Sequence, residues 1–151
     1  MKTSLSHRTI QLFFLLFLVF TIGYVGSGFM TPETRIWYNF LNKSPLTPPG
    51  FVFSIVWTIL LFLQALAAFL VWGKSSPRWF VVQLMLNMLW SFAFFYLRMP
   101  NIALIISGLF SCALFLNIKS FGRTNKLAGW LVLPTFLWSL FAIYLNAYIV
   151  F

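Results

Sequence analysis

The chain is almost devoid of the residues that carry acid–base and metal chemistry. Among 151 residues there is one acid, Glu33, one histidine, His7, and one cysteine, Cys112. Conventional catalytic sites and metal sites need such groups close together, so no metal site and no required cofactor is predicted. A lone cysteine also excludes an internal disulfide framework, and its apolar neighbours predict that Cys112 is a small buried residue.

Charged residues of both signs are scarce. They make up 7% of the chain, against roughly 25% in ordinary globular domains. Hydrophobic residues account for 62% and aromatic residues for 21%, and the mean hydropathy is +0.95. A water-soluble surface is therefore excluded. A membrane-spanning helix needs about 20 residues, so the chain, residues 1–151, has room for a single transmembrane domain and for no separate soluble domain.

Long apolar runs supply the spans. They are read at about 10–28, 51–72, 79–97, 102–118 and 127–151. Lipid offers no partner to backbone groups and no run alternates like a barrel strand, so the spans must be helices. The predicted fold class is all-α: an integral membrane bundle of five transmembrane helices. Breaks are expected at 73–78, 100–101 and 119–126, and the long connection 29–50 is predicted to be a lid loop.

The first run also admits another interpretation. Lys2 and Arg8, followed by an apolar stretch that ends near Gly23, resemble a cleavable signal peptide. No small-residue cleavage site is evident, however. The glycines around the end of the run, including Gly26, fit close packing between membrane helices equally well.

The net charge of +9 does not indicate nucleic-acid binding, because the ten Lys and Arg residues are spread over the termini and loops. Such cations set membrane orientation and contact lipid headgroups. With the N-terminus in the cytoplasm, seven of the ten lie inside and three, Arg35, Lys43 and Arg98, lie outside. The prediction is a multi-pass protein of a bacterial cell membrane, with its C-terminus outside.

Amides and indoles recur along helical stripes inside the predicted spans. Three stripes show this pattern: Trp57 with Gln64; Gln83 with Asn87 and Trp90; and Pro134 with Trp138, Ala142 and Asn146. Hydrogen bonds between helices are the commonest use of such amides, and we expect this role for Gln64 and Asn146.

The tryptophans fall into two groups by depth. Those beside loop cations are predicted to anchor helix ends at the membrane interface: Trp72, Trp79 and Trp130. Trp57, Trp90 and Trp138 lie deeper and share faces with amides. Indoles at that depth suit a pocket for a flat apolar molecule, in which stacking supplies affinity and a few polar groups set orientation.

Three separated motifs resemble the TspO/MBR family of tryptophan-rich sensory proteins and translocator proteins. The first is Trp37-Tyr38, Leu41, Lys43, Pro45, Pro48-Pro49, Phe53 and Trp57; the second is Gln83-Leu84-x-Leu86-Asn87-x-x-Trp90-Ser91; the third is Pro134-x-x-x-Trp138-x-x-Phe141-Ala142-x-x-Leu145-Asn146. Together they cover nearly the whole chain. The resemblance implies a five-helix bundle, often dimeric, with a pocket capped by the loop between the first two helices.

The resemblance also implies ligands and site residues. Family members bind porphyrins and related flat apolar ligands. By motif position the pocket would contain Trp57, Asn87, Trp138 and Ala142, with Tyr38, Pro45 and Pro48 from the lid; Trp90 is added from its stripe. Departures from the family pattern stand at Leu46, Phe51, Leu61 and Thr135. The animal sterol-recognition pattern is absent, because no cation follows Tyr148.

Three functions are compatible with these residues. The leading one is a membrane receptor or sensor for a tetrapyrrole such as protoporphyrin, with its propionates near Arg35 or Lys43. The alternative is an enzyme that degrades porphyrin photo-oxidatively, with Trp138 or Trp57 as the electron donor. A transporter ranks third, because the spans contain no ionisable residues of the kind that mark transport pathways. The expected partners are the lipid bilayer, the tetrapyrrole and a second copy of the chain, and not nucleic acid.

Overall fold

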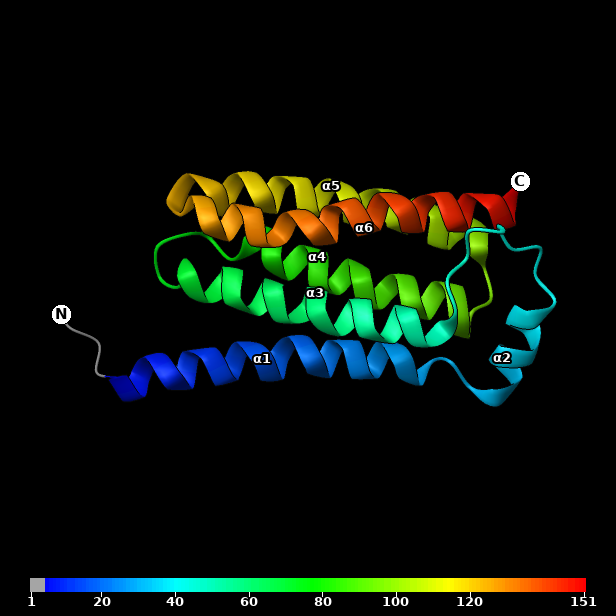
Figure 1. Ribbon diagram of the computed structural model, residues 1–151, viewed down its shortest axis with the longest axis horizontal. Coiled ribbons are helices and arrows are strands. Elements are labelled where there is room, and N and C mark those ends of the chain that lie inside the picture. Colours follow the sequence, from blue (N-terminus) through cyan, green and yellow to red (C-terminus); the bar gives the residue numbers. More distant parts are fainter. Residues whose placement is uncertain (1–4) are drawn as a thin grey trace.

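The computed structural model describes residues 5–151 and is all-helical over that range (Figure 1). The elements are α1 (Leu5–Gly28), α2 (Pro32–Asn39), α3 (Gly50–Leu70), α4 (Arg78–Ser91) with its continuation η1 (Phe92–Tyr96), α5 (Pro100–Thr124) and α6 (Lys126–Val150). Five helical segments are long and apolar enough to cross a membrane. The predicted fold class is confirmed. Lys2, which was used to predict orientation, lies outside the described residues.

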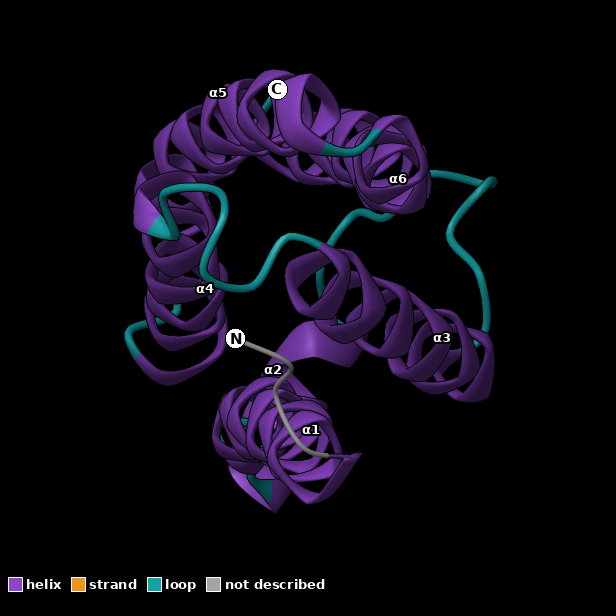
Figure 2. Cartoon of the chain, turned by 90° about the vertical axis from the view of Figure 1, so that its left-hand side faces the viewer, coloured by secondary structure: helices purple, strands orange, loops and turns teal. Residues whose placement is uncertain are grey.

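Four of the long helices surround a common interior, and the fifth packs on the outside. Viewed from one end, α3, α4, α5 and α6 enclose the centre, while α1 lies against α3 and α4 (Figure 2). The tightest pair is α5 with α6. A Cβ atom added at Gly129 would lie 3.0 Å from the Cα atom of Gly122, so glycine is what allows these two backbones to approach.

Helix α1 is integrated into the bundle. A Cβ atom added at Gly23 would lie 2.7 Å from Cδ1 of Leu61 on α3, and Val19 is completely buried. The opposite face of α1 exposes Phe13, Phe17 and other large apolar side chains, as expected for a surface in lipid. This two-sided packing favours a transmembrane helix over a signal peptide.

The break between α5 and α6 is shorter than expected. The interruption predicted over 119–126 reduces to one residue, Asn125, because α5 continues to Thr124. The Asn125 backbone is extended, and its Oδ1 accepts hydrogen bonds from the N–H groups of Leu127 (2.9 Å) and Ala128 (3.4 Å). A single asparagine cap therefore both ends one helix and starts the next.

The lid segment contains a helix where a loop was expected. Thr31 caps α2 by accepting a hydrogen bond from the Thr34 N–H (3.2 Å), and Pro32 occupies the first turn. Glu33 follows in that same turn. A backbone hydrogen bond and the Thr31 hydroxyl lower the pKa of Glu33, so its carboxylate complements the helix N-terminus.

The end of α4 next to the lid changes from α-helix to π-helix over Phe92–Tyr96, which an unbroken span over 79–97 did not anticipate. The Leu97 N–H bonds the Phe92 carbonyl oxygen (3.0 Å), and Arg98 adopts φ 56°. Wider turns leave carbonyl groups available to other partners. The Phe95 carbonyl accepts a hydrogen bond from the Thr34 hydroxyl (3.2 Å), which joins the lid to this end of α4.

The prediction for Cys112 is wrong. Its side chain is exposed, whereas Ser111 and Ala113 on either side of it are buried. A bilayer accepts a thiol on the outer face of a membrane helix as readily as a core does, so apolar neighbours in the sequence do not imply burial in such a protein.

Candidate functional site

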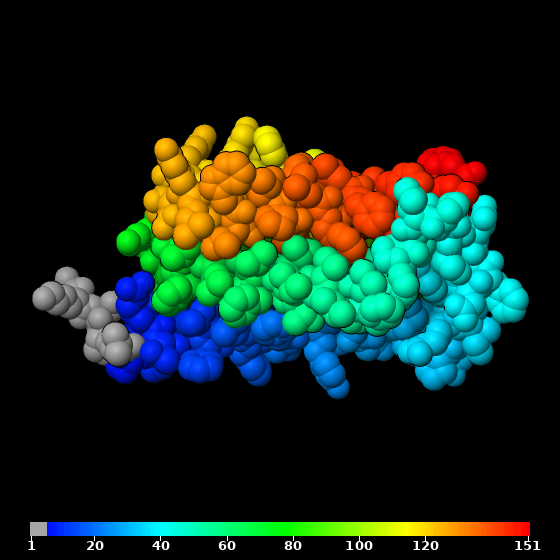
Figure 3. All heavy atoms as spheres, in the orientation of Figure 1, coloured from blue at the N-terminus to red at the C-terminus, as the bar shows by residue number. Residues whose placement is uncertain are grey.

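The lid packs aromatic rings onto one end of the bundle. Ring centroids of Trp37 and Tyr38 lie 5.8 Å and 6.2 Å from that of Phe94, in edge-on geometry. Burial raises the pKa of the Tyr38 hydroxyl. In the space-filling view the lid, in cyan, covers the end of the bundle beside the C-terminal turns of α6 (Figure 3).

Polar contacts of two residues, Lys43 and Ser44, fix the second half of the lid. Lys43 Nζ donates to the carbonyl oxygens of Tyr38 (2.7 Å) and Asn39 (3.2 Å), and lies 4.7 Å from the Tyr38 ring centroid. The Ser44 hydroxyl shares a 3.0 Å hydrogen bond with the Tyr144 hydroxyl on α6. Pro45 is exposed and Pro48 is half-buried. The predicted lid residues therefore form an ordered cap tied to both α4 and α6.

Trp57 faces the interior of the bundle. Its ring lies 6.4 Å from the ring of Phe110 on α5, at an interplanar angle of 37°. It packs against the main hydrophobic core and is half-buried. Asn87, also half-buried, shares its face of α4 with Gln83 and Trp90, four and three residues away. The interior position predicted for Trp57 matches this geometry.

Trp90 has a hydrogen bond within the protein. Its Nε1 donates to Oδ1 of Asn146 (3.2 Å), and Asn146 Nδ2 donates to the Pro100 carbonyl (2.9 Å). The Trp90 ring also stacks on Phe94, with centroids 5.0 Å apart. One chain of contacts thus joins α4, α6 and the start of α5. The interhelical role predicted for Asn146 is confirmed, and the Trp90 N–H is already used in it.

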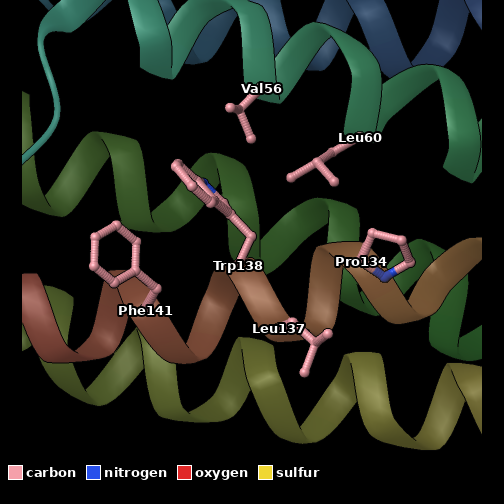
Figure 4. Close-up of a pocket in the computed structure, with 6 residues that line it drawn as sticks. All are labelled: Val56, Leu60, Pro134, Leu137, Trp138 and Phe141. Carbon is pink, nitrogen blue, oxygen red and sulfur yellow. The ribbon is translucent and has the colours of Figure 1, made fainter.

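Trp138 is placed differently, at the seam between α3 and α6. Its ring lies 5.7 Å from Phe53 and 5.4 Å from Phe141, and its Nε1 is buried without a hydrogen-bond partner among residues 5–151. The ring borders an apolar groove of about 460 Å³ (Figure 4). The other residues along the groove are Val56, Leu60, Pro134, Leu137 and Phe141.

An aromatic ladder runs from this groove to the lid. Phe141 stacks on Tyr144 at 6.3 Å, and Tyr144 meets Tyr148 at 6.4 Å. Tyr144 is also the partner of Ser44 in the lid. The groove and the cap therefore belong to one continuous surface on α6, with Ala142 half-buried one turn from Trp138.

Several residues that complete this region were not singled out as site residues. Phe53 lies four positions before Trp57, so helical spacing could have indicated it. Phe110 and Tyr144 had no such signal, because their partners Trp57 and Ser44 are far away in the sequence. Only the folded chain brings these pairs together.

The four positions at which the chain departs from the family pattern are either exposed or in contact with other residues. Leu46 and Phe51 are exposed. Leu61 packs toward Gly23, and the Thr135 hydroxyl accepts a hydrogen bond from Gln64 Nε2 (3.3 Å). Gln64 in turn accepts one from Gln83 Nε2, which confirms the interhelical role predicted for Gln64.

Metal chemistry has no support in the described part of the chain, where no group of three or more His, Cys, Asp or Glu residues comes together. The site therefore offers aromatic faces, amides and one unpaired indole N–H. Such a set recognises a flat, largely apolar molecule by stacking.

Comparison with known proteins agrees with this architecture. Residues 14–151 match the TspO/MBR family. The chain belongs to that family. It is 36% identical to the tryptophan-rich protein TspO of Chlorobaculum tepidum, over 85% of this chain and 87% of that protein. Identity to the Archaeoglobus fulgidus protein of the same name is 34%, with the same shares. The human translocator protein is 31% identical, over 82% of this chain and 78% of the human protein.

Family membership and the fold agree on a membrane-embedded bundle. The match begins inside α1 and covers every later helix, so lid, groove and interior all belong to the matched region. The protein is thus a multi-pass integral membrane member of the TspO/MBR family.

Proposed function

We propose that this protein is a membrane receptor or sensor that binds porphyrins, such as protoporphyrin, in a pocket in the outer half of the bundle. The proposal rests mainly on Trp138. Its large aromatic ring lies beside an apolar groove, and its buried N–H has no partner among the described residues. A buried donor of this kind is costly unless a ligand uses it. The aromatic lid supports the same conclusion.

The macrocycle would stack on the indoles of Trp57 and Trp138, with Tyr38, Pro45 and Pro48 above it and Asn87, Trp90 and Ala142 beside it. Its propionates must stay near the outer interface, because charges at the membrane centre are expensive. Lys43 is the better cation for them. It is half-buried in the second half of the lid, whereas Arg35 is exposed on α2 and lines a surface groove with Met30 and Asn39. An exposed ion pair contributes little, so stacking dominates affinity.

The same proposal includes an orientation and an assembly state. The bias of loop cations puts the N-terminus in the cytoplasm and the lid and C-terminus outside. Exposed apolar helix faces would allow a homodimer in the bilayer. No cofactor is required, since the porphyrin is the ligand.

Titration with protoporphyrin in detergent, followed by tryptophan fluorescence, tests the proposal. Trp138→Ala is expected to weaken binding roughly tenfold, since a lost stacking contact of ~1.4 kcal/mol corresponds to that factor. The matched control is Trp130→Ala, on the same helix but largely exposed at its other end, and it should bind like the parent. Equal affinity of the Trp138 variant and the parent would exclude this pocket.

A second candidate function rests on the same indoles. Trp57 and Trp138 are both half-buried, and the N–H of Trp138 has no partner among the described residues. An indole can give one electron to a photoexcited porphyrin, with dissolved oxygen as the final oxidant. The rate of porphyrin loss under illumination, measured with the parent and with Trp57→Phe and Trp138→Phe, distinguishes an enzyme from a receptor. If the parent protein degraded porphyrin no faster than free porphyrin is degraded, only the receptor function would remain.

A further inference from the structure

A layer of polar side chains crosses the inner half of the bundle, away from the lid. It takes one residue from each of the helices that surround the interior: Gln64 from α3, Gln83 from α4, Asn117 from α5 and Thr135 from α6. Their exposed fractions are 1%, 0%, 0% and 0%. Neither water from outside nor lipid headgroups can reach these groups from the surface.

Direct contacts satisfy only part of this layer. Gln83 Nε2 donates to Gln64 Oε1, and Gln64 Nε2 donates to the Thr135 hydroxyl at 3.3 Å. Among residues 5–151, Oε1 of Gln83 and both amide atoms of Asn117 are buried with no hydrogen-bond partner. A donor group and two acceptors therefore remain unpaired inside one layer.

The helix register places Gln83 and Asn117 at the same level. Phe80 on α4 meets Phe121 on α5, with ring centroids 6.0 Å apart. The two helices run antiparallel. One turn from this contact toward the lid therefore leads to Gln83 on α4 and to Asn117 on α5. The phenylalanine pair thus closes the layer on its inner side, and Trp57 with Phe110 lies on its outer side.

Two other sets of buried polar groups in the bundle are paired directly. The hydroxyls of Ser111 on α5 and Ser139 on α6 share a 2.7 Å hydrogen bond, and Asn146 uses both ends of its amide. Polar groups in native interiors that lack a protein partner are usually bonded to ordered water. Water suits this layer because one molecule can accept from an N–H and donate to a carbonyl oxygen.

We propose that this layer is an internal hydration site, in which ordered water bonds the Asn117 amide and Gln83 Oε1 and joins them to the network of Gln64 and Thr135. The site is separate from the porphyrin pocket and does not depend on it. The bundle would then contain a hydrated polar layer, bounded by Phe80 and Phe121 on the side away from the lid.

A crystal structure of the parent protein in lipid, at about 2 Å or better, tests the proposal directly. Expected is water density about 2.7–3.2 Å from the Asn117 amide and from Gln83 Oε1. A map in which these atoms bond directly to protein groups, or have no partner, would contradict the proposal. Because this experiment uses the unaltered chain, it does not depend on the folding of any variant.

Radiolytic hydroxyl labelling supplies an independent measurement in solution, since radicals formed from a trapped water oxidise the side chains next to it. In the parent, Phe80, Leu84 and Phe121 should be labelled although they are buried. Asn117→Leu should reduce that labelling to background. Ser111→Ala, on the same helix but with a direct partner, should leave it unchanged. Background labelling in the parent, or an equal fall in both variants, would contradict the proposal.

Discussion

The half of the bundle next to the lid, called here the outer half, and the opposite, inner half each contain an unpaired buried polar group, but in different surroundings. In the outer half Trp138 leaves an N–H unused beside a groove of about 460 Å³ that opens between α3 and α6. In the inner half Asn117 leaves an amide unused in a layer with no exposed surface. An unpaired donor on a ring that borders an open groove indicates a ligand site, whereas an unpaired amide among other buried polar groups indicates water.

The two halves also differ in how their helices pack. The outer half is built from large rings in edge-on and tilted contacts and is covered by a separate segment, the lid. The inner half is built from close backbone contact between α5 and α6 at Gly122 and Gly129. The half next to the lid therefore depends on ring contacts, and the opposite half depends on the close approach of two helix backbones.

Substitution of Gly129 should have the largest effect on stability of the changes that test this comparison. In Gly129→Ala the new Cβ meets the Gly122 backbone at 3.0 Å and the Ile118 carbonyl oxygen at 3.2 Å, so the two helices must separate. Overpacking of this kind costs about 1–3 kcal/mol. Thermal unfolding in detergent should show a lower Tm, by roughly 2–4 °C for each kcal/mol lost.

The control for this prediction is Gly108→Ala on α5. A Cβ atom there would meet nothing within 4 Å, and alanine is a better helix former than glycine, so Tm should hold or rise. An equal fall in both variants would show that glycine at 129 has no special packing role.

Trp90 and Trp138 allow the comparison to be sharpened within the outer half. Trp90→Phe removes a hydrogen bond and leaves Asn146 Oδ1 without its donor, which should cost about 1–2 kcal/mol of stability. Trp138→Phe removes an N–H that had no partner, so it should cost less than about 1 kcal/mol. Porphyrin affinity should change in the reverse order, with the larger loss at Trp138.

The two measurements are Tm without ligand and the protoporphyrin Kd of each variant. If both variants lost stability equally and affinity equally, the distinction between a structural and a ligand-facing tryptophan would be wrong.

Much of the fold could be predicted from the sequence, because membrane spans depend on long apolar runs that are visible residue by residue. The exceptions have local causes. Asn125 alone ends α5 and starts α6, so the broad polar stretch around it did not mark a loop. Thr31 and Pro32 start a helix in the lid, yet a short helix leaves little periodicity to detect.

The site was predictable only as a set of residue types. Stripe spacing identified Trp57, Trp90 and Trp138 as a group, but it could not show that the Trp90 N–H is used by Asn146 while that of Trp138 is unpaired. That difference depends on contacts between helices far apart in the sequence. Whether a side chain is exposed cannot be predicted from the sequence of a membrane protein either, because lipid and core accept the same side chains. Cys112 is the example.

The smallest expected effect concerns the contact between lid and bundle. Ser44→Ala and Tyr144→Phe each remove one side of a 3.0 Å hydroxyl pair that joins the lid to α6. A neutral hydrogen bond of this kind contributes about 0.5–1.5 kcal/mol. If the lid covers the ligand, each variant should release protoporphyrin severalfold faster. The double variant should be no faster than Ser44→Ala, which also removes the acceptor of the Leu46 N–H (3.1 Å). Stopped-flow release measures this coupling as a double-mutant cycle. Additive rate increases would show that the two hydroxyls act separately, and an unchanged release rate would show that the lid does not control the pocket.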